Sequence, residues 1–154
     1  MNAGIPLGYM LSRCRRVFKH QMNSEFRNKE IDLTFEQYVI LKLLDLNADF
    51  IQQDFAEILQ KDKSVIVRHA NFLLEHHYVE RQTNNSDKRK KNLTLTKNGA
   101  QILNRMKDIS AEVTRKLLFG VTENELDTFQ RVLVKIQENG GVEQESLVCG
   151  ETGK

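Results

Sequence analysis

The strongest candidates for chemistry in this chain lie on one face of a predicted helix that starts after Asp62. Asp62 can accept hydrogen bonds from the free backbone N–H groups of the first turn, so we expect it to cap the helix. Apolar residues recur on one side at Ile66, Ala70, Leu73 and the neighbouring Leu74, which predicts a face that rests on a core. The other side carries five residues: Ser64, Val65, Val67, Arg68 and Asn71. Valines can meet thymine methyl groups while the polar residues bind base edges or phosphates, so this face predicts binding in a DNA major groove.

Simpler interpretations of the same residues stay open. Arg68 and Asn71 could be ordinary exposed helix residues, and a rotated helix would put the two valines in the core. His69 is expected to pack beside Ala70 rather than to read a base. It has no cysteine or acidic partner at the spacing of a metal site, so no metal is expected here.

A basic β-hairpin is expected directly after this helix. The segments YVERQT (78–83) and NLTLT (92–96) alternate like strands, and NNS (84–86) between them is typical of a turn. The loop is expected to hold one carboxylate and four cations: Asp87, Lys88, Arg89, Lys90 and Lys91. Such a tip fits a wing that reaches a neighbouring DNA groove, although a solvated basic loop with another role is the alternative.

These parts together resemble the MarR family of bacterial transcription regulators. The resemblance rests on DKS with Arg68 four residues after Ser64, on YVER, on Asp87 and Arg89 spaced D-x-R, and on LT followed by NG. It extends from about residue 5 to about residue 138. Three positions depart from the family pattern. Gln60 and Lys61 replace a glycine and an apolar residue between the two helices of the motif, and His77 replaces the glycine that often ends the recognition helix. A histidine at that last position would have to adopt a left-handed backbone.

The resemblance implies a mainly α-helical fold with a small β-hairpin wing, a winged helix-turn-helix with N- and C-terminal dimerisation helices. It implies a homodimer that binds a pseudo-palindromic operator in double-stranded DNA, as a ligand-responsive repressor. In the family, small aromatic effectors bind between the dimer helices and the DNA-reading lobes. Arg16, His20 and Tyr38 are polar groups that could line such a crevice, beside the alternative of surface or packing roles.

Capping patterns indicate where the helices that position this unit begin. Thr34 with Gln37, and Thr122 with Glu125, have the spacing of capping boxes, and Thr96 can cap a helix that runs to about residue 118. Gly120 is expected to end that helix. The expected helices cover residues 5–28, 35–46, 52–60, 97–118 and 123–138. We expect one winged-helix domain over residues 1–154, with dimerisation helices at 5–28 and 97–138, a DNA-binding lobe at 34–96 and a mobile tail at 139–154.

Apolar stripes are expected on the helices outside the DNA-binding lobe. The first helix has one at Leu7, Met10, Leu11, Cys14, Val17, Phe18 and Met22, the fourth at Ile102, Met106, Ile109 and Val113, and the last at Leu126, Phe129, Val132, Leu133 and Ile136. Because these stripes exceed what one small lobe can cover, they fit a dimer interface.

The two cysteines, Cys14 and Cys149, have neither C-x-x-C spacing nor a histidine partner, so a zinc site or disulfide framework is not expected. Oxidant-sensing members of the family use a cysteine in the first helix. Cys14 falls on the apolar stripe, where we expect it to act as a small buried hydrophobe. A redox-sensing regulator through Cys14 therefore stands as an alternative, as does a winged-helix module for protein contacts.

Bulk properties agree with a nucleic-acid binder and offer no sign of an enzyme. The net charge is only +2, but residues 61 to 97 hold nine lysines and arginines against four acidic residues, so that this segment is +5 and the rest −3. No P-loop, G-x-S-x-G, H-E-x-x-H or dinucleotide motif is present, so neither catalysis nor a cofactor is expected. No long apolar run or signal peptide is apparent, and a cytoplasmic protein without membrane contact is expected.

Overall fold

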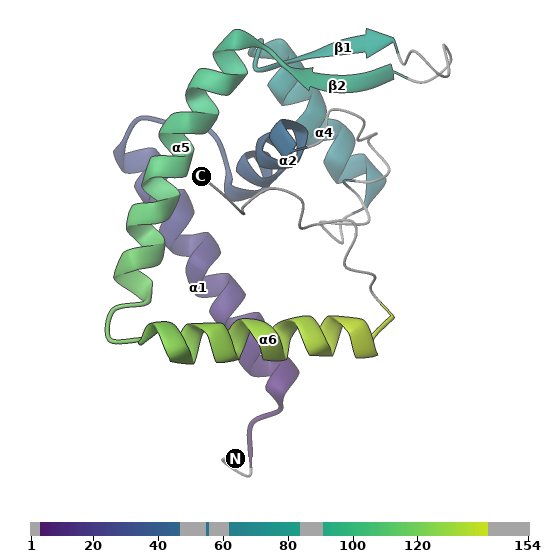
Figure 1. The fold of residues 1–154 in the computed structure, drawn as a ribbon. Coiled ribbons are helices and arrows are strands. Elements are labelled where there is room, and N and C mark those ends of the chain that lie inside the picture. The colour runs from purple at the N-terminus through teal and green to yellow at the C-terminus, as the bar shows by residue number, and fades with distance from the viewer. Residues whose placement is uncertain (1–3, 47–54, 56–61, 84–90, 142–154) are drawn as a thin grey trace. The chain divides into compact units, whose positions relative to one another are not determined.

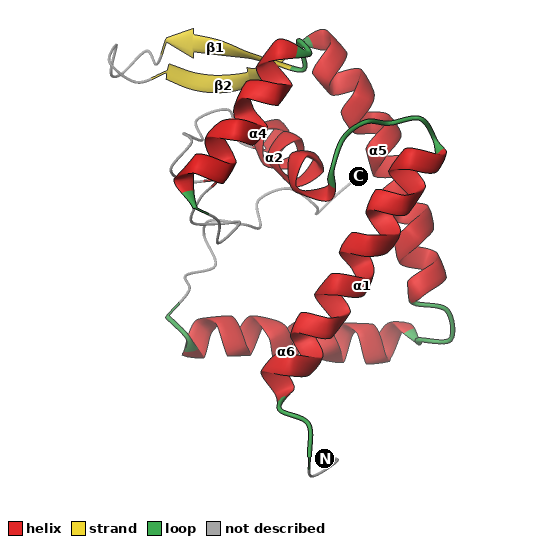
Figure 2. Cartoon of the chain, turned by 180° about the vertical axis from the view of Figure 1, so that it is seen from behind, coloured by secondary structure: helices red, strands yellow, loops and turns green. Residues whose placement is uncertain are grey.

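The computed structural model describes residues 4–46, 55, 62–83 and 91–141 of the chain, and it is mainly helical with one β-hairpin (Figures 1 and 2). The elements are α1 (Leu7–Asn28), α2 (Phe35–Leu46), α4 (Lys63–Glu75), β1 (Val79–Thr83), β2 (Lys91–Leu95), α5 (Lys97–Leu117) and α6 (Glu123–Asn139). The predicted fold class is confirmed. Of the helix expected at 52–60, only Phe55 lies among the described residues, and it is helical and fully buried.

The chain divides into two compact units, Met1–Leu117 and Leu118–Lys154. The first unit holds the hydrophobic core. In it α1 packs along α5, while α2 contacts α1, α4, α5 and β2. The largest fully buried side chains come from all of these elements: Phe26, Ile40, Leu41, Phe55, Ile66, Leu73, Leu93, Leu103 and Met106. The second unit contains α6, which has no buried residue.

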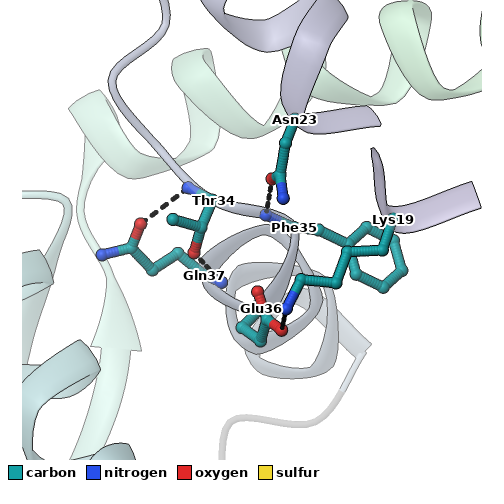
Figure 3. Close-up of polar contacts among 6 residues, drawn as sticks. All are labelled: Lys19, Asn23, Thr34, Phe35, Glu36 and Gln37. Atoms are coloured by element: carbon teal, nitrogen blue, oxygen red, sulfur yellow. Dashed lines mark hydrogen bonds and ion pairs between the residues drawn. The ribbon is translucent and has the colours of Figure 1, made fainter. Parts of the chain in front are cut away.

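Side-chain caps fix the start of α2 and tie it to α1 (Figure 3). The Thr34 backbone N–H donates to Gln37 Oε1 at 2.7 Å, and the Gln37 N–H donates to Thr34 Oγ1 at 3.3 Å, which confirms the predicted capping box. The Phe35 N–H donates to Oδ1 of Asn23, on α1, at 2.7 Å. The second predicted box is also confirmed, since Thr122 and Glu125 satisfy each other's backbone at the start of α6.

Two helices end at a left-handed residue that is not glycine. At the end of α1, Glu30 has φ 57°, and at the end of α4, His77 has φ 56°. The bonds around His77 are those of a Schellman motif: its N–H donates to Leu74 O at 3.0 Å, and the Tyr78 N–H donates to Leu73 O at 2.9 Å. The expected left-handed histidine is therefore confirmed. Gly120, with φ 83°, follows α5 as expected.

Candidate nucleic-acid interface

The outward face of α4 carries three exposed polar side chains. Ser64, Arg68 and Asn71 are exposed, and their spacing of four and three residues puts them on one side of the helix. On the opposite side Ile66, Ala70 and Leu73 are fully buried, as predicted, while Leu74 is half-buried. The helix therefore presents a polar row and buries an apolar one, and the use of that polar row for DNA stays a prediction.

Two details of α4 differ from expectation. Val65 and Val67, expected to be fully exposed, are half-buried, because they flank the buried Ile66 at the edge of the core face. Asp62 occupies the N-cap position, but its side chain makes no capping hydrogen bond. Its backbone carbonyl instead accepts from the N–H groups of Val65 and Ile66, at 2.9 and 3.3 Å. Because they are half-buried, the two valines leave only part of each side chain accessible to DNA.

The hairpin after α4 is antiparallel with a regular register. Val79 pairs with Leu95, Arg81 with Leu93 and Thr83 with Lys91. Lys91, expected in the loop, is the first residue of β2. The predicted wing tip, with Asp87, Lys88, Arg89 and Lys90, lies outside the described residues, as do Gln60 and Lys61. The structure thus describes the two strands on which that tip is built.

A junction of four residues, His77, Tyr78, Thr96 and Gly99, joins the end of α4 to the start of α5. The Thr96 hydroxyl donates to His77 O at 2.7 Å and accepts from the Gly99 N–H at 2.9 Å. The Thr96 N–H donates to Tyr78 O at 3.1 Å. A Cβ on Gly99 would lie 1.9 Å from that same carbonyl oxygen, so the close approach requires glycine. The LT-x-x-G pattern thus has a physical basis: Thr96 and Gly99 hold the candidate recognition helix and the hairpin against α5.

Sequence reasoning missed a ring stack that supports the same end of α4. The rings of Phe72 and His76 stack with centroids 4.0 Å apart, and the rings of His76 and Tyr78 are 6.2 Å apart and nearly parallel. His76 Nδ1 lies 2.8 Å from Phe72 O. The F-x-x-x-H-x-Y spacing, with Phe and His one turn apart, was the only available signal.

An ion pair between α1 and α2 lies close to α4. Lys19 Nζ pairs with Glu36 Oε1 (Figure 3). Burial alone would raise the pKa of Glu36, but the hydrogen bond and charge of Lys19, a backbone hydrogen bond and the charge of His69 together lower it. His69 is half-buried and belongs to α4. Glu36 therefore connects three helices electrostatically.

The residues proposed to line an effector crevice are not brought together by any described contact. Arg16 and His20 are exposed on successive turns of α1. Tyr38 is a core residue, 9% exposed, whose ring lies 5.8 Å from that of Phe26 and 6.4 Å from that of Phe35. Tyr38 thus packs on the inward face of α2, and a role in effector binding stays a prediction for all three residues.

Cys14 is exposed, although a buried position was expected. The reason is that α1 buries only Met22 and Phe26, both in its C-terminal half. Cys14 lines an open groove of about 360 Å³ together with Met10, Arg13, Val17, Phe18 and Leu117. Leu7, Met10 and Val17, from the same predicted stripe, are 49–57% exposed. The stripe on α5 behaves differently, since all four of its residues are buried as predicted.

The stripe on α6 is also uncovered. Phe129 and Val132 are each 49% exposed and Ile136 is 40% exposed, while Leu126 and Leu133 are half-buried. Within the described part of the chain, no cluster of three or more potential metal ligands occurs. No described helix combines the length and the apolar character needed to cross a membrane.

Comparison with known proteins places this geometry in a family. Residues 33–91 match the family model described as MarR family. The structure is similar to the crystal structure of the transcriptional regulator SlyA, with 25% identity, a TM-score of 0.76 and coverage of 88% of this chain and 94% of that one. It is similar to wild-type apo MarR from E. coli, with 24% identity, a TM-score of 0.74 and coverage of 86% and 97%.

A cysteine-to-serine mutant of E. coli MarR, solved in complex with operator DNA, matches with 24% identity, a TM-score of 0.74 and coverage of 86% and 94%. The family model matches the segment that contains α2, α4 and β1, and the structural likeness covers 86–88% of the chain. The chain therefore carries a MarR-family domain, set in the winged helix-turn-helix fold of the MarR regulators.

Proposed function

We propose that this protein is a sequence-specific DNA-binding transcriptional regulator. The observation that carries the proposal is the polar row of Ser64, Arg68 and Asn71 on α4, followed directly by a hairpin whose loop sequence holds the cations of the predicted wing. In this function α4 enters the major groove, and Arg68 and Asn71 read base edges. The similar E. coli MarR mutant in complex with operator DNA supports the same use of the fold. No enzyme activity is proposed.

The regulator acts as a homodimer on a pseudo-palindromic operator. Support comes from apolar residues that the first unit leaves exposed on α1, such as Met10 and Val17, and that the second unit leaves exposed on α6, such as Phe129. Apolar surface of this extent is typical of a protein interface. A two-fold dimer would present two copies of α4 to half-sites about one helical turn apart.

The finer parts of the proposal come from the family resemblance. They are that the regulator is a repressor, that it acts in the cytoplasm and that a small aromatic effector changes its DNA affinity. The residues proposed for such an effector are Arg16 and His20, exposed on α1, and Tyr38, buried on α2.

The test is DNA binding by the full chain, measured by fluorescence anisotropy. Duplexes enriched from a random pool by this protein are compared with unselected duplexes at several salt concentrations. We expect tighter binding to the enriched duplexes, an inverted repeat within them, and an affinity that falls steeply with salt because phosphate contacts release counterions. Failure to enrich any duplex, with no binding at low salt, would instead favour a winged-helix module for protein contacts.

A second candidate function is redox sensing through Cys14, favoured by its exposure beside the groove on α1. Reactive cysteines are accessible, often with basic neighbours, and Arg13 and Arg15 are adjacent in the sequence. In this function peroxide releases the protein from its DNA, and Cys14→Ser abolishes the release. Peroxide resistance of the wild-type complex would exclude it.

A further inference from the structure

A groove of about 450 Å³ runs between α4 and β1. Its helix wall includes Asn71 and Glu75, and its strand wall includes Val79 and Arg81. Asn71 also belongs to the polar row of α4, so the groove opens beside the face proposed to read DNA. The sequence pattern YVER contains Arg81, but no role follows for it from that pattern alone.

The register of the hairpin decides where Arg81 points. Val79 and Arg81 lie on the same face of β1, because strand residues two apart share a face. Val79 is only 2% exposed, and Leu93, the cross-strand partner of Arg81, is also 2% exposed. Arg81 itself is exposed. Its side chain therefore lies on the core-facing side of the hairpin, but beyond the edge of the core. There it lines the groove beside α4.

Among the described residues, none pairs with the guanidinium group of Arg81. Within residues 4–46, 55, 62–83 and 91–141, no ion pair or hydrogen bond involves it. Glu80 also lines the groove, and its carboxylate accepts from Gln82 Nε2 at 3.2 Å. Glu75, on the helix wall, is exposed and forms no ion pair with Arg81. Among the described residues, the groove thus holds the unpaired guanidinium of Arg81 and the amide of Asn71, beside the carboxylates of Glu75 and Glu80.

The geometry of B-DNA indicates which part of the duplex would lie between α4 and the hairpin. Neighbouring major and minor grooves are separated by one sugar-phosphate backbone. If α4 enters the major groove and the hairpin reaches the adjacent minor groove, that backbone must run between them. We propose that the groove between α4 and β1 holds this backbone, with Arg81 as a ligand to its phosphate. The inference rests on the proposed DNA-binding function and adds a contact to it.

Arginine suits this position for two reasons. Its planar fork can bind two phosphate oxygens at once, and it is always charged. A phosphate contact carries no base preference, so Arg81 would set the register of the protein on the duplex rather than choose its sequence. The carboxylates of Glu75 and Glu80, which also line the groove, would oppose the phosphate and lower affinity.

The experiment compares the full-length wild type with Arg81→Gln, Arg81→Lys and Glu75→Gln on enriched and unselected duplexes over a range of salt concentrations. Arg81→Gln is expected to weaken binding to both duplexes by similar factors of about tenfold or more. It should also lower the slope of log affinity against log salt by about one per half-site, since each lost phosphate contact removes about that much. Arg81→Lys is expected to keep most of the slope, and Glu75→Gln to tighten binding.

Arg115→Gln is the matched control, because it removes the same charge from an exposed site 18 residues into α5 from Lys97, roughly 27 Å from the hairpin end of that helix. If Arg81→Gln and Arg115→Gln have equal effects, the inference is overturned while the proposed function stands. If both Arg81→Gln and Glu75→Gln weaken binding, the two side chains serve each other rather than a phosphate, and the inference is again overturned. A wild type whose binding is insensitive to salt would contradict the proposed function itself.

Discussion

The helices α4 and α6 are both amphipathic in sequence, but they differ in how far their apolar faces are buried. α4 buries Ile66, Ala70 and Leu73 within the first unit, whereas α6 has no buried residue and leaves Phe129 about half exposed. The N-terminal half of α1 resembles α6 in this respect. A helical apolar stripe therefore predicts that a face needs a cover, but whether that cover belongs to the same chain depends on tertiary contacts. In the proposed function, the covered helix reads DNA and the uncovered ones hold the dimer.

The largest expected effect is at the junction that holds α4 in place. Gly99→Ala puts a methyl group against the Tyr78 carbonyl, where the Cβ would be 1.9 Å from oxygen. We expect a loss of at least about 3 kcal/mol in the free energy of unfolding, since backbone must move to admit it. Urea unfolding measures the loss. Gly8→Ala is the control, because a Cβ there meets nothing within 4 Å; it is expected to stabilise α1 by about 1 kcal/mol. Equal stability of the two variants would contradict the assigned role of the junction.

The uncovered helices give the next largest effect. We expect the wild type to be a dimer at micromolar concentration, and Val17→Glu or Phe129→Glu to weaken dimerisation by at least about 2 kcal/mol, because each buries a charge in an apolar interface. Light scattering across a dilution series measures the mass. Gln101→Glu, at an exposed position of α5, controls for added charge. A monomeric wild type at that concentration would contradict the prediction that the exposed apolar faces of α1 and α6 form a dimer interface.

The polar row of α4 is tested by Arg68→Ala. If Arg68 pairs with a guanine edge, affinity for the enriched duplex falls by about 1 to 3 kcal/mol and preference relaxes at one position per half-site. Fluorescence anisotropy on single-base variants of the duplex measures both. Arg115→Ala is the charge-matched control. An equal loss on enriched and unselected DNA would assign Arg68 to a phosphate instead.

The left-handed end of α4 offers a gain in stability. His77→Gly relieves a side chain held at φ 56° and is expected to raise the free energy of unfolding by about 1 kcal/mol. His76→Gly, one residue earlier at φ −89°, should lower it, because the stack with Phe72 is lost. Thermal unfolding of the two variants distinguishes them, and a loss in both would mean that the His77 ring has contacts worth more than the backbone strain.

The smallest expected effect depends on pH. Because the pKa of Glu36 is lowered in the folded protein, its pair with Lys19 stabilises the fold above the ordinary glutamate value of about 4.3. That contribution is lost as pH falls through the folded pKa. Glu36→Gln should therefore cost up to about 1 kcal/mol at pH 7, since Lys19 is partly exposed, and progressively less as the pH falls below about 4.3. Asp108→Asn, at an exposed site on α5, is the control. A cost that does not change with pH would mean that Glu36 acts by packing.

Local patterns predicted most of the fold because local physics decides it. The Thr34–Gln37 and Thr122–Glu125 boxes and the left-handed end of α4 at His77 follow from interactions within a few residues. Periodicity within one helix likewise predicted which face of α5 is apolar. The burial of the candidate site residues was harder to predict from the sequence. Cys14 was expected in the core but is exposed, whereas Tyr38 is a core residue whose proposed role at an effector crevice stays a prediction. Periodicity gives the direction of a side chain, not the extent of the neighbouring element that covers it.

By itself the sequence determined the order of the elements, the polar row on α4 and the basic segment after it, since these depend on residue type and on spacing along one helix or strand. Only the tertiary structure decided that Val65 and Val67 are half-buried, that Gly99 lies against the Tyr78 carbonyl and that Arg81 opens into a groove shared with Asn71. Each of these depends on how closely two elements approach. That distance is set by packing between residues far apart in the chain, and no pattern within either segment contains it.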